Sequence, residues 1–512
     1  MDSRHSGRGD FHTVYKGQSV DDLVIQYMEE NNVPGMVLSI VQAPHITRIV
    51  GYGIADIKTK RLVATRTVFN VGQLTNAFTA VAIMQLKEEG KLYLDDLISS
   101  YLPNLPASWQ SITIKELLTH SSGIPDYTQN TSFNYANHYE PHQIINLISN
   151  TLLFQPGTQM QVSATNHYLL GWIIEKSSGM SYQDYVTKNQ IERMGLKNTF
   201  FIDNIQSIPN EVNNGTNPFK HSEFLQNLVF VDPTEPATGY EQSENGLEAA
   251  ASMTWTSSFS NSGIVSSAED ISIWDIGLAG TILIKEPENR SFLYGAPTLD
   301  GKVIPGNAGW FFPGHKGLME IKGALPGYSA FLSRFTDPKE LLCVTLLANK
   351  GNLPDLDILA RKIAAAFDIN LGVPQREAFW SETIQSPYSV KNTIERVANI
   401  IQKQGGTVFA HIDHAAEAKK TNQHLPDTEV VIIGNPAKGT ALMQENAAFA
   451  LDLPLRIMAT QDRVGQVWLS FTDPVKLAKE YQLEVQQVPV LKKILTALQL
   501  VCEKAVSAQS TI

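Results

Sequence analysis

Apolar and polar positions form two kinds of pattern along the first part of the chain, one typical of strands and one typical of a helix. The runs PGMVLSIVQ (34–42) and TRIVGYGIAD (47–56) are β-rich and are separated by a short break with Pro and His, which predicts a β-hairpin. From Thr75 to about Glu89, apolar side chains recur at helical spacing, and Gly90 follows them. We therefore expect a helix there.

A stretch from about residue 95 to residue 290 is dominated by helical patterns and turn signals. Apolar runs typical of strands follow it, and a helical pattern (355–368) ends this region. These runs are AGWFF (308–312), YSAFLSRF (328–335) and ELLCVTLLAN (340–349). Strands from both ends of one domain, separated by a helical insert, indicate an α/β fold.

The composition changes after this region. Residues 369–390 carry Pro, Gly and Ser without periodicity, as linkers do. Beyond them, two amphipathic helices (390–405 and 489–506) enclose several β-like runs, which predicts a compact α+β unit. We place a flexible N-terminus, or residues foreign to the domain, at 1–17, the first domain at 18–372, a linker at 373–388 and the α+β domain at 389–512.

Composition narrows the possible partners. The 512 residues are 43% hydrophobic, which is enough for ordinary buried cores. They carry 40 Lys and Arg against 51 Asp and Glu, a net charge of −11 without a basic block. That balance argues against nucleic acid or an anionic membrane surface as the main partner.

The sequence also gives little support for a membrane span or a metal site. No apolar run approaches the roughly 18–20 residues that span a bilayer, and the first residues lack the apolar stretch of a secretory signal. Cys343 and Cys502 stand far apart without a CxxC pair. Neither a disulfide framework nor a zinc site is expected, and the sequence implies no cofactor.

Several stretches of the chain match segments of one known protein family, in the same order and at plausible spacings. Among them are FNVGQLTNAFTAVAIMQLKEEGKLYLDDL (69–97), ITIKELLTHSSGIPDY (112–127), SGIVSSAEDISIW (262–274) and GALPGYSAF (323–331). The chain from Val33 to Asp368 resembles the serine β-lactamase and penicillin-binding-protein superfamily, in particular its class C β-lactamase-like, D-aminopeptidase and esterase branch. The resemblance implies an antiparallel sheet flanked by helices, with a helical insert, and a periplasmic or secreted location.

The resemblance also implies a reaction. A Ser at the start of a helix attacks an acyl carbon, a Lys three residues later accepts its proton, and backbone N–H groups near the helix start hold the oxyanion. The positions of this Ser-x-x-Lys signature hold Gln73 and Asn76. An amide nitrogen is a poor nucleophile, and neither amide titrates near neutral pH, so the attack has no side chain to perform it.

The two other family motifs, Tyr-x-Asn and Lys/His-x-Gly, are also altered. They align with Val162, Ser163 and Ala164, and with Ile321, Lys322 and Gly323. The cation of the third motif is missing unless a one-residue bulge turns Lys322 inward. We expect no hydrolase activity of the family's kind. The alternative is a residual or altered hydrolase of the esterase, β-lactamase or D-aminopeptidase type, which uses other residues such as Thr75 or Ser163.

The cleft of such a domain can still bind a ligand. A helix start favours an anion, and Gln73 can donate and accept hydrogen bonds there. Because Gln is longer than Ser, the cleft is either a small-ligand pocket or partly plugged. The resemblance implies a packing and turn role for His120. The residues expected to line the cleft are Gln73, Asn76, Ser163, Lys322, Gly323 and Tyr328, with His315 and Lys316 as further candidates.

The C-terminal region has a resemblance of its own, to the small bacterial family named domain of unknown function 302. It rests chiefly on TIERVANIIQKQGGTVFAHIDHAAEA (393–418) and VVIIGNPAKGTALMQENAAFALDLPLRIMATQDRVGQVWLSFTDP (430–474), and it implies an α+β fold and self-association. His411 and Asp413 share one side of a strand, because its period is two, and His414 follows. A ligand pocket, a metal site and a structural role remain open for them; no third ligand has a clear spacing, so no metal is expected.

These observations lead to one leading hypothesis and two alternatives. The leading hypothesis is a domain without its family's hydrolase activity, fused to a small α+β domain and acting as a binding or regulatory protein for small-molecule or peptide-like ligands. The first alternative is the altered hydrolase. The second is an inert fusion that serves assembly, with a homo-oligomer formed through the C-terminal domain.

Overall fold

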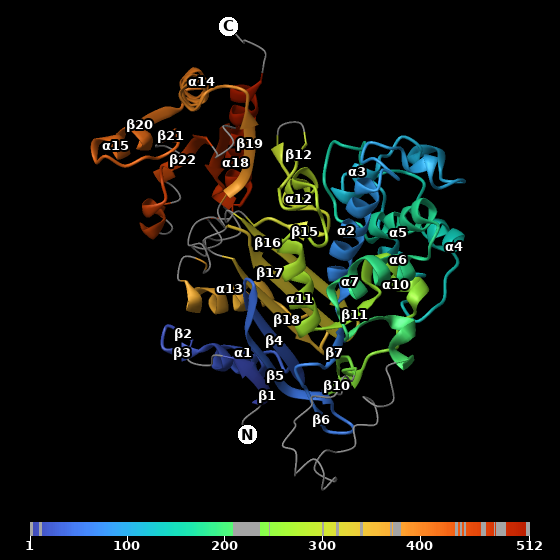
Figure 1. The fold of residues 1–512 in the computed structure, drawn as a ribbon. Helices are drawn as coiled ribbons and strands as arrows, with labels where there is room; N and C mark the ends of the chain where they lie inside the picture. Colours follow the sequence, from blue (N-terminus) through green and yellow to red (C-terminus); the bar gives the residue numbers. More distant parts are fainter. Residues whose placement is uncertain are drawn as a thin grey trace. The chain divides into compact units, whose positions relative to one another are not determined.

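The computed structural model describes most of the chain, and it divides the chain into two compact units (Figure 1). The first unit spans Met1–Pro297 and Pro305–Pro374, and the second spans Thr298–Ile304 and Gln375–Ile512. The described residues are 4–9, 13–207, 236–244, 246–299, 302–313, 317–337, 341–368, 371, 380–435, 439–440, 443–444, 447–461, 467–475, 477 and 488–507.

The first unit is organised around one antiparallel sheet. Its strand order is β1-β5-β4-β18-β17-β16-β15-β14, and β6 pairs with β5 beside this path. The strands are β1 (Arg4–Gly9), β4 (Gly35–Gln42), β5 (His45–Asp56), β6 (Arg61–Leu62), β14 (Gly306–Asn307), β15 (Trp310–Phe311), β16 (Leu318–Leu325), β17 (Tyr328–Phe335) and β18 (Leu342–Ala348). The predicted hairpin is β4–β5, and β18 pairs with β4, so strands from both ends of the domain share one sheet, as expected.

Both faces of this sheet are covered. On β4, Met36 and Leu38 belong to one buried cluster and Val37 to another, because successive side chains point to opposite faces. Helices α1 (Val20–Glu30) and α13 (Leu356–Phe367) contribute to the first cluster. The second cluster contains α11 and the helical insert. Its helices are α2 (Thr75–Glu88), α3 (Ile114–Leu118), α4 (Pro141–Asn146), α5 (Ala164–Ser178), α6 (Tyr182–Val186), α7 (Glu192–Met194), α10 (Trp255–Ser262), α11 (Ala268–Ala279) and α12 (Pro287–Leu293).

Short strands complete the first unit. A small sheet has the order β7-β11-β8, and two separate strand pairs are β9–β10 and β2–β3. Their bounds are β2 (Val14–Tyr15), β3 (Gln18–Ser19), β7 (Val68–Asn70), β8 (Thr199–Phe201), β9 (Tyr240–Ser243), β10 (Gly246–Ala249) and β11 (Ile264–Ser267). Strand β7 leads directly into the turn before α2, so this small sheet positions the helix start.

The N-terminal segment differs from the expectation of a flexible stretch over 1–17. Arg4–Gly9 forms β1 and pairs antiparallel with β5. Backbone N–H and C=O groups make this pairing at the edge of a sheet, and polar or glycine residues can supply them as well as apolar ones. The polar composition of the segment therefore concealed a strand.

The second unit has an α+β fold, as predicted. Its sheet has the order β12-β13-β19-β23-β22-β21-β20. Apolar side chains of helices α14 and α18, such as Ile394 and Leu498, pack into one buried cluster with the sheet. The elements are β12 (Thr298–Leu299), β13 (Lys302–Val303), β19 (Trp380–Ser386), α14 (Val390–Lys403), β20 (Thr407–Asp413), α15 (His414–Lys420), β21 (Thr428–Gly434), β22 (Leu455–Gln461), β23 (Val467–Thr472) and α18 (Val488–Val506).

Two boundaries differ from the prediction. Residues 380–386, placed in the linker, form strand β19. Residues 298–299 and 302–303, placed in the first domain, form the paired strands β12 and β13, and β13 pairs with β19 through Lys302 and Ile384. Strand β19 reads WSETIQS, in which Ile384 is buried at 1% exposure among polar residues. A strand with so few apolar positions lacks the pattern that predicts strands.

Candidate functional site

The start of helix α2 is built around a tight backbone turn. A short 3-10 turn at Gly72–Leu74 precedes α2, and Gly72 has φ +56°, a left-handed conformation that favours glycine. The side chain of Asn70 accepts a hydrogen bond from the N–H of Gly72 at 2.9 Å. This turn presents Gln73 at the N-terminal end of the helix.

Gln73 contacts the edge of the main sheet. Its Oε1 atom accepts a hydrogen bond from the backbone N–H of Ala324 on β16, with an N–O distance of 2.7 Å. The pairing between β15 and β16 is at Glu320, so Ala324 lies beyond it along the strand. The backbone N–H of Ala324 faces position 73, and the half-buried Gln73 side chain is its hydrogen-bond acceptor.

Asn76 lies one turn further along α2 and is 5% exposed. The backbone of Gly309, in the turn between β14 and β15, packs against it, since a Cβ added at Gly309 would stand 2.7 Å from the Cβ of Asn76. No described group hydrogen-bonds to its Oδ1 atom. Asn76 was expected to line the cleft, but it lies beneath a backbone turn where a ligand reaches it poorly.

In the second motif, Val162 to Ala164, the central residue Ser163 is buried. Ser163 immediately precedes α5 and is 1% exposed, whereas Val162 is 46% exposed. Ala164 begins α5, and its N–H donates to Oδ2 of Asp126 at 3.1 Å. Ser163 was expected to line a cleft, and its hydroxyl is buried in this structure; contact between Ser163 and a ligand stays a prediction.

His120 has the packing and turn role that was expected of it. It is 4% exposed and has φ +54°, and its Nδ1 atom accepts a hydrogen bond from the N–H of Ser163 at 3.3 Å. Burial lowers the pKa of His120 to about 4. The ring lies 4.9 Å from that of His167, also fully buried, whose pKa is lowered by burial as well.

The third motif lies on β16. Ile321 is 1% exposed and packs in the core, whereas Lys322 is exposed. The register between β16 and β17 is regular from Leu318 to Leu325, so no bulge turns Lys322 inward. A Cβ added at Gly323 would stand 2.3 Å from the carbonyl oxygen of Val71. This close approach of the turn before α2 explains why a glycine stands at this position.

Tyr328 borders a cavity of about 630 Å³. Its hydroxyl donates to the carbonyl of Ala237 at 2.9 Å, and burial raises the pKa of the phenol to about 12. Asn70 and Trp255 also line the cavity, and the described lining residues do not include Gln73 or Asn76. His315 and Lys316 lie outside the described residues.

In the second unit, the candidate residues take separate partners. Nε2 of His411 lies 2.6 Å from Oε2 of Glu429 on the neighbouring strand. Asp413 shares the exposed side of β20 with His411, as predicted, but its Oδ1 caps helix α15 by accepting the N–H of Ala416 at 2.8 Å. His414 is the exposed first residue of that helix. In the part of the chain that is described, no three His, Cys, Asp or Glu side chains are arranged to hold a metal ion.

Two contributors to these sites carried little sequence signal. Ala324 acts through its backbone N–H, which every residue except proline has. Glu429 is 7% exposed on β21 and was not predicted; an acid within the mostly apolar run TEVVIIG is the signal that could have pointed to a partner for His411. Among the described residues, no helix is both long enough and apolar enough to span a membrane.

Two family models match the chain. The model named Beta-lactamase matches residues 20–367, and the model named Domain of unknown function DUF302 matches residues 382–501. Protein flp of Staphylococcus aureus is 25% identical over 348 residues, 65% of this chain and 62% of that protein. Fluoride-specific ion channel FluC 1 of Brucella suis is 43% identical over 114 residues, 22% of this chain and 45% of that protein. The chain thus spans less than two thirds of either relative.

Solved structures share the fold. The octameric penicillin-binding protein homologue from Pyrococcus abyssi has a TM-score of 0.54 at 19% identity, covering 88% of this chain and 89% of its own. The D-amino acid amidase from Ochrobactrum anthropi, complexed with D-phenylalanine, has a TM-score of 0.54 at 19% identity, covering 69% of this chain and 99% of its own. Because the Beta-lactamase model matches residues 20–367, which is more than half of the chain, this chain belongs to the β-lactamase-like family and carries a C-terminal DUF302 domain.

Proposed function

We propose that the first unit no longer carries out its family's acyl transfer and serves as a ligand-binding or regulatory domain. The observation that supports this most directly is the hydrogen bond from the N–H of Ala324 to Oε1 of Gln73 at 2.7 Å. A nucleophile at position 73 would hold its acyl group within reach of this N–H, which could then stabilise an oxyanion. In this chain the side chain of residue 73 itself occupies that donor.

The proton-transfer positions support the same proposal. General acid–base catalysis needs a titratable group within hydrogen-bond reach of the reacting atoms. The amide of Asn76 does not titrate, and the two other positions carry hydrocarbon side chains, Val162 and Ile321. Ser163 is only 1% exposed, which leaves its hydroxyl poorly placed to attack a substrate. Neither attack on an acyl carbon nor protonation of a leaving group has a candidate among these residues.

The ligand we propose is a small or peptide-like molecule bound in the first unit. The cavity of about 630 Å³ beside Tyr328 has the size of a small-molecule site and mixes apolar side chains with polar ones such as Asn70 and Thr256. A structural relative holds D-phenylalanine, which makes D-amino acids and their amides the first ligands to test. Self-association is a further part of the proposal, since one structural relative is octameric.

Covalent probes test the loss of acyl transfer. We expect a fluorescent penicillin and a fluorophosphonate to leave the purified full chain unlabelled, because the positions of the nucleophile and its base hold the amides Gln73 and Asn76. The double variant Gln73→Ser/Asn76→Lys should not hydrolyse nitrocefin, because Val162 and Ile321 leave the proton relay incomplete. Stoichiometric labelling of the unmodified chain would end the proposal.

Thermal denaturation tests binding separately. A ligand at 100 times its dissociation constant stabilises the folded state by about 2.7 kcal/mol. We expect at least one member of a panel of D-amino acids, D-amino acid amides and peptidoglycan fragments to raise the melting temperature of the full chain. An unlabelled protein without a shift across the whole panel would favour the inert assembly role instead.

A further inference from the structure

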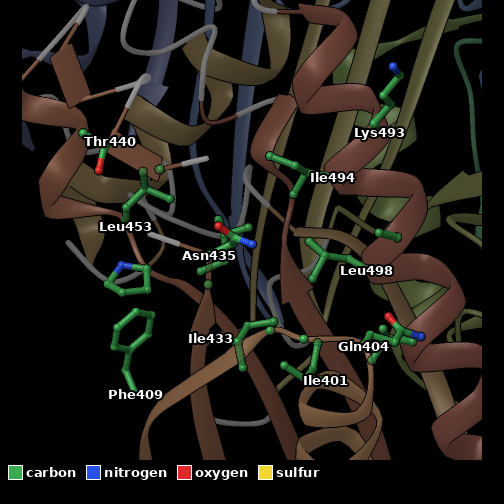
Figure 2. A pocket seen from close by; sticks show the side chains of 18 of the residues that line it. Ile401, Gln404, Phe409, Ile433, Asn435, Thr440, Leu453, Lys493, Ile494 and Leu498 are labelled. Carbon is green, nitrogen blue, oxygen red and sulfur yellow. The ribbon is translucent and has the colours of Figure 1, made fainter. Parts of the chain in front are cut away.

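The second unit contains a cavity of about 400 Å³ that the candidate residues His411, Asp413 and His414 do not line. Helix α14 and the glycines after it, strands β20 to β22 and helix α18 border it, as Figure 2 shows in a close view. Most of its lining is aliphatic or aromatic, including Ile401, Phe409, Ile433, Leu453 and Leu498. It lies within one unit and is separate from the candidate site of the first unit.

Glycines keep this space open. Gly434 lies between two side chains of the wall, since a Cβ added there would stand 3.2 Å from Cε2 of Phe409 and 3.3 Å from Cβ of Pro454. A Cβ at Gly439 would meet its nearest neighbour, Leu453, only at 3.7 Å, and one at Gly405 would meet nothing within 4 Å. The backbone itself therefore forms part of the wall, and room remains in front of it.

The lining leaves apolar surface in contact with solvent. Phe409 is 49% exposed on β20, and Ala497 is exposed on α18. Removing such surface from water is favourable by roughly 25 cal/mol per Å², so an apolar molecule gains free energy by filling the cavity. Mostly apolar walls with a few polar groups are the usual lining of a small-molecule site.

One charged side chain lies on the rim. Figure 2 shows Lys493 at the edge of the cavity, on the helix that also presents Ile494 and Leu498 to it. The described lining residues include no Asp or Glu, so the rim favours a negative charge. Lys493 and Ala497 are neighbours on one face of α18, which places the base of the long Lys493 side chain at the mouth of the apolar space, with its ammonium directed outward in Figure 2.

We propose that this cavity binds a small amphipathic anion, with an apolar chain in the cavity and a carboxylate beside Lys493. A medium-chain carboxylate has this chemistry: its hydrocarbon chain contacts the apolar walls while the carboxylate stays at the solvent-exposed rim. Site and ligand belong to the second unit and do not depend on the function proposed for the first.

Calorimetric titration of the full chain with decanoate, below its micelle concentration, tests this proposal. We expect one decanoate to bind per chain, and decanol and decylamine, which share its chain length, to bind more weakly. Lys493→Gln should weaken decanoate binding by about threefold to fivefold, the size of one exposed ion pair, and leave decanol unchanged. Lys492→Gln is the matched control, because Lys492 is exposed on the same helix and does not line the cavity.

A second pair of variants tests the cavity itself. Ala497→Phe should fill the space and abolish decanoate binding, whereas Thr496→Phe, at the exposed neighbouring position outside the lining, should not. Absence of decanoate binding, or equal binding of all three probes with no effect of Lys493→Gln, would overturn the proposal. So would an oligomer that sedimentation detects in the unmodified chain and that Ala497→Phe dissociates, because the cavity would then be an interface between copies.

Discussion

The side-chain amide oxygen of Gln73 accepts a hydrogen bond from the backbone N–H of Ala324 at 2.7 Å. This contact joins the start of α2 to strand β16, two segments 251 positions apart in the chain. It couples two of the three motif regions, since Ala324 directly follows Gly323. The first prediction concerns the strength of this contact.

Replacing Gln73 with Ala should destabilise the protein by about 1–2 kcal/mol, because the N–H of Ala324 loses its partner in a half-buried place. Gln73→Glu should cost less, since a carboxylate oxygen can accept the same hydrogen bond. Urea denaturation of the full chain, followed through the transition of the first unit, measures both. Equal stability of Gln73→Ala and the unmodified chain would show that the contact contributes nothing to folding.

Gly323→Ala should be more damaging than its small size suggests. The added Cβ would stand 2.3 Å from the carbonyl oxygen of Val71, so the backbone must shift, at a cost of about 1–3 kcal/mol. Lys322→Ala, at the exposed neighbouring position, is the control and should stay within about 0.5 kcal/mol of the unmodified chain. A well-tolerated Gly323→Ala variant would mean that the turn and the strand are not in close contact.

A buried ion pair holds β16 against helix α13. Nε of Arg361 lies 2.9 Å from Oε1 of Glu320, and both residues are less than 10% exposed. Arg361→Met should cost about 3–5 kcal/mol because it leaves a buried carboxylate without its cation, and the double variant Arg361→Met/Glu320→Met should recover much of that loss. Denaturation of the two single variants and the double variant measures the coupling; additive effects would contradict it.

Stability should fall as the solution becomes acidic. Burial lowers the pKa of His120 from 6.5 to about 4, so between these pH values the unfolded chain takes up a proton that the folded chain does not. The contribution of His120 to stability is therefore complete above about pH 6.5 and decreases as the pH falls to 4, by on the order of 3 kcal/mol.

The variant His120→Asn tests this pH dependence. Asn tolerates the left-handed backbone at this position, where φ is +54°, and it does not titrate. Denaturation midpoints at several pH values between 4 and 7 should fall less steeply for the variant than for the unmodified chain. Parallel curves would show that His120 is not the source of the acid sensitivity.

Some of the architecture was predictable because local pattern and final environment agree. Strands β4 and β5 contain many apolar residues that favour strands, and α2 has apolar side chains at helical spacing before Gly90. Strands β1 and β19 were not predicted because backbone pairing forms them and few of their residues are apolar. The boundary near residues 298–303 was missed as well, because the two-residue strands β12 and β13 join the sheet of the second unit through backbone pairing.

The sequence by itself determined which side chains stand at the motif positions, because side-chain chemistry is a property of each residue: amides at positions 73 and 76, and hydrocarbons at 162 and 321. Only the tertiary structure decided that Gln73 meets the N–H of Ala324, that Ser163 is buried, and that a cavity opens between α18 and the sheet of the second unit. The partner of a backbone N–H and the shape of a cavity depend on contacts between segments that are distant in the chain, and a local sequence pattern does not predict such contacts.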